Sequence, residues 1–117
     1  MTAIAWAMTK MYSQDWNGQC EVFVEKAYGT QYKYLTAQRA YDALHTSTTW
    51  TPDIGALVWF VPNSSNGGNG HVGIYIGNGQ FISATYNGVK VQYMNWWSDH
   101  LAPYEGWGNA PTSWPGQ

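Results

Sequence analysis

The stretch GHVGIYIGNGQFISATYNGVKVQY, residues 70–93, decides the fold class because it predicts three consecutive antiparallel strands. Apolar alternation places these strands at residues 71–76, 80–85 and 89–93. Between them stand Gly77-Asn78-Gly79 and Asn87-Gly88, which have the residues that tight hairpin turns require. The stretch therefore predicts a β-meander.

Further elements are predicted on both sides of the meander in the sequence. An apolar run predicts a further strand at residues 56–61, and residues 104–107 predict a short fifth strand. Upstream, the spacing changes to that of helices, which are expected over residues 3–13, from Cys20 to near Gly29, and after the capping residue Thr36. In the first of these helices the expected buried face consists of Ile4, Met8, Met11 and Tyr12. Helices followed by an antiparallel sheet of four to five strands indicate the α+β class.

The composition fits a single domain. The chain has 117 residues, and we expect residues 1–108 to form the domain and the Pro- and Gly-rich residues 109–117 to be a tail or linker. The net charge is −2 and the few cationic residues are scattered, which argues against a nucleic-acid partner. No apolar run is long enough to insert into a membrane, and residues 1–4 do not resemble a signal peptide.

Cys20, the only cysteine, is the first candidate for chemistry. It follows the turn residue Gly18, and with Phe23, Val24 and Ala27 it has the spacing of one buried helix face. An isolated cysteine on an apolar face is usually an inert core residue. A position on the first helical turn instead favours a reactive thiol, because free N–H groups and the positive end of the helix dipole gather there.

His71 is the second candidate, and strand alternation selects its neighbours. Val72, Ile74 and Ile76 form one apolar face, so His71 lies on the other face with Gly73 and Tyr75. The turn at residues 77–79 places Ser83 opposite Gly73 and Thr85 opposite His71. Ser83, Thr85 and Asn87 are therefore the alternatives for a polar group that orients the imidazole.

A thiol, an imidazole and an orienting group are the components of a cysteine hydrolase. The backbone N–H of Cys20 is one candidate for stabilising the oxyanion, and a polar side chain just upstream, Gln19, Asn17 or Tyr12, is another. Aromatic residues make up 17% of the chain, and rings in a groove stack on sugars and peptides. The candidates for substrate binding are Tyr12, Trp16, Tyr75 and Trp96. The acidic residues lack the spacing of a calcium loop, so we expect no metal and no cofactor.

Three motifs together carry a family resemblance. They are Gly18-Gln19-Cys20 at a helix start, the strand segment Pro52–Phe60, and GHVGIYIGNG at residues 70–79. With this order and spacing the chain resembles the NlpC-type and CHAP-type cysteine peptidases over about residues 14–107, and the "GQC" start is nearer to CHAP. The resemblance implies a papain-like fold, Cys20 as nucleophile and His71 as base. The chain departs from the pattern at the third residue, where those families place His, Asn, Gln or Glu and this sequence offers Ser83 or Asn87.

The resemblance also implies a substrate and a place of action. Such enzymes cut amides in the stem peptide or cross-bridge of bacterial peptidoglycan, and at this size the chain is similar to the catalytic domain of a phage endolysin. We expect a monomer that acts on the cell wall and reaches it by a route such as a phage holin. Two alternatives stay open: a cysteine amidase or acyltransferase toxin with a non-wall substrate, and an aromatic-rich wall-binding module with a degenerate site.

Overall fold

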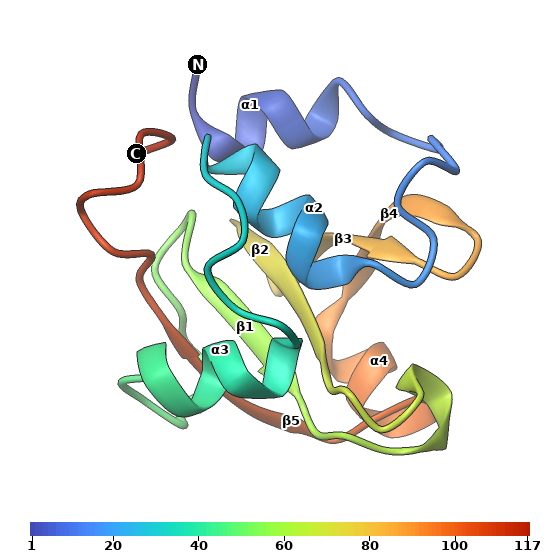
Figure 1. Ribbon diagram of the computed structural model, residues 1–117. Helices are drawn as coiled ribbons and strands as arrows, with labels where there is room; N and C mark the ends of the chain where they lie inside the picture. Colours follow the sequence, from blue (N-terminus) through green and yellow to red (C-terminus); the bar gives the residue numbers. More distant parts are fainter.

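The computed structural model describes residues 1–117 and contains one five-stranded antiparallel sheet. Its strands are β1 (Leu57–Phe60), β2 (His71–Gly77), β3 (Gln80–Thr85), β4 (Gly88–Tyr93) and β5 (Tyr104–Gly108). They are arranged in the order β4-β3-β2-β1-β5 (Figure 1). The meander predicted from residues 70–93 is therefore confirmed, and β1 and β5 extend it on the side of β2.

Three helices cover one face of the sheet: α1 (Ala3–Met8), α2 (Cys20–Ala27) and α3 (Ala37–Leu44). In Figure 1, α2 crosses in front of β2 and β3, and α3 lies in front of β1. The larger hydrophobic core fills this interface, with Phe23 and Val24 of α2 packed toward Val72 and Ile74 of β2. The α+β arrangement with the Cys20 helix against the sheet matches the prediction.

The opposite face of the sheet is covered by a fourth helix, α4 (Met94–His100), which the sequence reasoning did not foresee. Met94 and Trp97 pack there with Phe60 and Phe81 in a second core cluster. Residues 99 and 100 end this helix, and both are exposed. The helix matters for the candidate site because it places Trp97 on the face of the sheet that carries His71.

The register of β2 and β3 agrees with the prediction. Ile74 pairs with Ile82, which places Gly73 opposite Ser83. A Cβ on Gly73 would lie 3.0 Å from the Cβ of Ser83, so a larger residue would crowd this row. Asn78 and Gly79 have φ angles of 55° and 73°, as a two-residue hairpin turn requires.

The N-terminal helix is shorter than predicted. It ends at Met8, not near residue 13, and Tyr12 has a φ of 66°, which no helix accommodates. The buried residues of α1 are Ala3 and Ala7, whereas Met8 and Tyr12 are 44% and 71% exposed. The expected buried face is therefore wrong for those two residues.

Residues 109–117, expected to be a tail or linker, pack onto the domain. Trp114 is buried and lies against the ring of Tyr28 with centroids 5.9 Å apart. Gly116 donates a hydrogen bond to the Tyr28 carbonyl and accepts one from the Ala3 N–H, which brings the two ends of the chain together (Figure 1). No helix has the length and apolar content to cross a membrane.

Candidate active site

Cys20 is the first residue of α2, as the sequence predicted. Residues 16–18 form the preceding turn, in which Gly18 has a φ of 73°. The Sγ atom of Cys20 lies 4.0 Å from the carbonyl oxygen of Gly70, the residue before His71. The thiol is thus held beside the beginning of β2, although Cys20 and Gly70 are 50 positions apart in the sequence.

His71 begins β2 and is almost fully buried, with 5% of its surface exposed. Its Nε2 atom lies 2.9 Å from Ser83 Oγ, within hydrogen-bonding distance. Of the three alternatives for the orienting group, Ser83 is therefore the one that contacts the imidazole. Thr85 Oγ1 instead donates to the Gly88 carbonyl and accepts from the Asn87 N–H, so Thr85 and Asn87 serve the β3–β4 turn.

Aromatic rings surround the imidazole on its other sides. The indole of Trp97 is stacked on it, with ring centroids 4.2 Å apart and an interplanar angle of 15°. Phe60 and Phe81 lie farther away, at centroid distances of 6.3 and 6.2 Å. One hydrogen bond and one stacked ring therefore fix both the position and the tilt of His71.

The buried amide side chain of Asn66 ties together the two ends of the loop before His71. Asn66 is buried in the short 3-10 helix η1 (Ser64–Asn66), where its Oδ1 accepts from the N–H groups of Asn63 and Gly70. Its Nδ2 donates to the carbonyl of Val61. Asn66 thus connects the two ends of the loop and fixes Gly70, whose carbonyl lies beside the thiol.

Burial makes the neutral forms of the pair the stable ones. It raises the pKa of the Cys20 thiol to about 11, against the opposing effect of the Val72 N–H, and the Glu21 charge also raises it. Burial lowers the pKa of His71 to about 3. At neutral pH the site therefore holds a thiol and an uncharged imidazole.

Glu21 stands next to Cys20 on α2, and a carboxylate there would oppose thiolate formation. Its side chain is buried, and both carboxyl oxygens lack a hydrogen-bond partner. Burial, with Glu25 nearby, raises the pKa of Glu21 to about 11, so the group is protonated at neutral pH. Glu25 instead accepts hydrogen bonds from the N–H groups of Lys33 and Tyr34. No negative charge consequently stands beside the sulfur at neutral pH.

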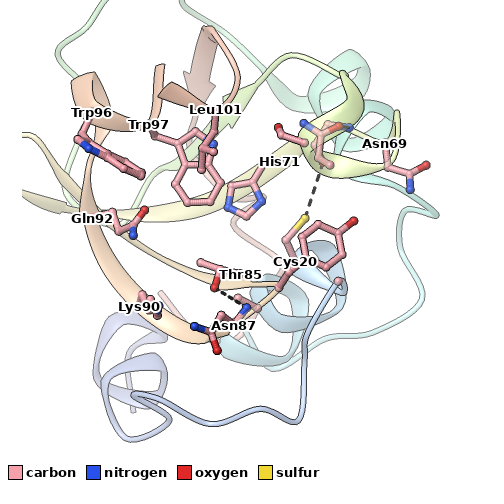
Figure 2. Close-up of a pocket in the computed structure, with 16 residues that line it drawn as sticks. Cys20, Asn69, His71, Thr85, Asn87, Lys90, Gln92, Trp96, Trp97 and Leu101 are labelled. Atoms are coloured by element: carbon pink, nitrogen blue, oxygen red, sulfur yellow. Dashed lines mark hydrogen bonds between the residues drawn. The ribbon is translucent and has the colours of Figure 1, made fainter. Parts of the chain in front are cut away.

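Cys20 and His71 open onto one groove with a volume of about 290 Å³ (Figure 2). That volume is near the lower end for ligand pockets, so the groove accommodates a few residues of a substrate. Two further predicted residues, Asn87 and Trp96, also line it. The remaining lining residues are Gly18, Ser65, Asn66, Asn69, Gly70, Ala84, Thr85, Tyr86, Lys90, Gln92, Trp97 and Leu101.

Besides Ser83, which contacts His71, four predicted site residues do not line this groove. Gln19 is exposed and makes no capping hydrogen bond, and Tyr12 is also exposed. Trp16 packs edge-on against Trp6 and Phe23 in the main core. The Tyr75 hydroxyl accepts a hydrogen bond from the Gly79 N–H, at the other end of β2. Those four assignments are wrong as contacts of this groove.

Trp97 and Asn66 are the residues that the sequence reasoning missed. A signal for Trp97 was present, since Met94, Trp97 and Leu101 have the i, i+3, i+7 spacing of a helix face. No comparable signal marks Asn66, because its role depends on loop geometry. No three His, Cys, Asp or Glu side chains come together in an arrangement that could hold a metal ion.

The chain and its fold are similar to known proteins. A model of the NlpC/P60 family matches residues 7–104. The fold is similar to that of NlpC1 from Trichomonas vaginalis, with a TM-score of 0.66 and 24% identity over 92% of this chain and 42% of that one. NlpC2 from the same organism gives a TM-score of 0.65 and 23% identity over 92% of this chain and 44% of that one. This chain thus spans less than half the length of either protein.

Proposed function

Because the chain belongs to the NlpC/P60 family, we propose that it hydrolyses an amide bond in the peptide part of bacterial peptidoglycan, with Cys20 as nucleophile and His71 as base. Members of that family are generally cysteine peptidases or amidases. The observation that carries the proposal is the shared groove, which is lined both by Cys20 of α2 and by His71 of β2 (Figure 2).

The proposed reaction begins with the neutral pair. With Nε2–H donating to Ser83 Oγ, Nδ1 keeps its lone pair and takes the proton from the Cys20 thiol as sulfur attacks the carbonyl carbon. The imidazolium then gives this proton to the departing amine as the C–N bond breaks. Water hydrolyses the resulting thioester, with the same imidazole as base, and the free thiol is restored.

Free backbone donors stabilise the oxyanion in this mechanism. Cys20 is the first helical residue of α2, so its N–H has no partner within the helix. The positive end of the helix dipole adds to the effect.

The groove has the composition that a peptide requires. Amide side chains from Asn69, Asn87 and Gln92 offer donors and acceptors to peptide groups, and Trp96 and Leu101 supply apolar surface. Trp96 is 43% exposed and stacks on His100, so its ring is free on its outer face. We assign the bacterial cell wall as the place of action on the same grounds.

The test is the digestion of purified sacculi, followed by turbidity and by mass spectrometry of released fragments. The native chain should clear the suspension and release peptides with new amine termini, whereas Cys20→Ala and His71→Ala should release none. His45→Ala is the matched control, because His45 is exposed and lies outside the groove, and it should remain fully active.

The other outcomes of this test are equally informative. Binding to sacculi without release of fragments would contradict hydrolysis and indicate a wall-binding module. Inactivity on every wall together with cleavage of another amide would contradict the wall substrate and retain the thiol mechanism.

A further inference from the structure

The groove carries a single formal charge at neutral pH. Lys90 is the only Lys or Arg among its lining residues, no carboxylate lines it, and burial keeps His71 uncharged. An unneutralised ammonium group beside an otherwise uncharged peptide groove favours a substrate with a negative charge at that position.

Lys90 lies directly opposite Ser83, the residue that contacts His71. It pairs with Ser83 across β3 and β4, so the two side chains share the face of the sheet on which Ser83 contacts His71. Two strand spacings separate β2 from β4, which is about 10 Å. Because an extended peptide advances roughly 3.3 Å per residue, the ammonium can reach a group within about three residues of the scissile amide.

A second polar group on this face lacks a partner. Gln92, two residues along β4 from Lys90, also lines the groove, and its Oε1 atom is buried without a hydrogen bond. Buried amide oxygens are normally paired, so this atom indicates a donor that the protein itself does not supply. Figure 2 shows Lys90 and Gln92 at the end of the groove away from Cys20.

We infer that Lys90 and Gln92 form an anion subsite, in which the ammonium binds a carboxylate of the peptide substrate within about three residues of the scissile amide. The Gln92 amide binds the neighbouring peptide N–H. This inference rests on the proposed peptide-hydrolase function and extends it, because it makes the preferred substrate an acidic peptide with free carboxyl groups.

The test uses two synthetic stem peptides of one sequence. One has free carboxyl groups on either side of the scissile amide, and the other has these groups converted to carboxamides. The native chain should cleave the free acid with a kcat/KM about tenfold higher or more, mainly through KM. Lys90→Met should remove this preference and Lys90→Arg should keep it. Lys26→Met is the matched control, because Lys26 is exposed outside the groove, and it should keep the native preference.

Equal cleavage of both peptides by the native chain, or an undiminished preference in Lys90→Met, would overturn the subsite. If neither peptide is cleaved, the proposed function fails for this substrate, and calorimetry with Cys20→Ala decides the subsite separately. Tighter binding of the free acid that Lys90→Met abolishes in this background would support the anion subsite without hydrolysis. Equal binding of both peptides, or binding of neither, would overturn it.

Discussion

The imidazole of His71 lies almost parallel to the indole of Trp97, with their centroids 4.2 Å apart. The two rings come from β2 and α4, which are separated in sequence by two further strands. Because Ser83 offers a hydroxyl where a stronger partner such as a carboxylate would be expected, the stacked indole contributes much of the constraint on the ring. In the proposed mechanism Trp97 is therefore a positioning residue for His71.

Replacing Trp97 tests this relationship. Trp97→Leu should lower kcat about fivefold to tenfold with little change in KM, since a stacked aromatic pair is worth roughly 1 kcal/mol. Trp97→Phe, which keeps an aromatic face, should retain most of the activity. Trp114→Leu is the control, because it removes a buried indole that lies against Tyr28, outside the groove. A loss of kcat in Trp114→Leu equal to that in Trp97→Leu would indicate general destabilisation instead.

Ser83 should be the polar residue on which the imidazole depends. Ser83→Ala removes the 2.9 Å contact with Nε2 and should lower kcat about fivefold, the effect of one neutral hydrogen bond. Thr85→Val is the comparison, because the Thr85 hydroxyl bonds to the β3–β4 turn, and its effect should appear in stability rather than in kcat. Steady-state kinetics and urea unfolding of both variants measure the difference, and unchanged kcat in Ser83→Ala would exclude the orienting role.

The protonated Glu21 should make the protein less stable as the pH rises. Its folded pKa of about 11 lies above the ordinary value of 4.5, so the unfolded chain releases the proton first and stability declines as pH increases above 4.5. Glu21→Gln removes this effect and should raise the free energy of unfolding by about 3 kcal/mol at pH 7, with no gain near pH 4.

Urea unfolding at several pH values from 4 to 8 measures this gain. Glu25→Gln is the control and should destabilise the protein, because the Glu25 carboxylate accepts two backbone N–H groups. A Glu21→Gln gain that does not change with pH would mean that Glu21 is ionised in the folded chain.

The rate of hydrolysis should persist into acid. Burial lowers the pKa of His71 to about 3, so the base stays unprotonated at pH values well below the ordinary 6.5 of histidine. The value of kcat/KM in the free enzyme should therefore show no decline near pH 6.5 and should fall only below about pH 4. A pH–rate profile with a soluble peptide measures this, and a midpoint near 6.5 would show that the imidazole is far better hydrated than its buried position implies.

Much of the site followed from local sequence patterns. Strand alternation and the turn at residues 77–79 placed Ser83 opposite Gly73, on the face of the sheet that carries His71. The structure has that register from Tyr75 toward His71, although Gly77 pairs with Gln80 and the register shifts between Tyr75 and Gly77. Helical spacing after Gly18 placed Cys20 on the first turn of α2. These features depend on short-range periodicity and turn chemistry, which a single sequence contains.

The remaining features depend on contacts that periodicity does not encode. Trp97 touches His71 only because α4 folds back over the sheet, and Trp114 is buried only because an irregular segment packs on Tyr28. Tyr75 lies on the predicted strand, but it is too far along β2 from His71 to line the groove. Its hydroxyl accepts a hydrogen bond from the Gly79 N–H instead. Trp16 was misassigned for a similar reason. The sequence near a candidate nucleophile has no local signal that distinguishes an aromatic residue of the core from one that lines the groove.

The central claim is that Cys20 attacks the amide carbon, and acid quenching of the reaction tests it most directly. The native chain is mixed with soluble stem peptide, quenched within milliseconds and analysed by intact mass and peptide mapping. A transient mass increase equal to the acyl fragment, on the peptide that contains Cys20, is the predicted result, and Cys20→Ala should show neither adduct nor product. Hydrolysis of the peptide by Cys20→Ala at the native rate would contradict the account.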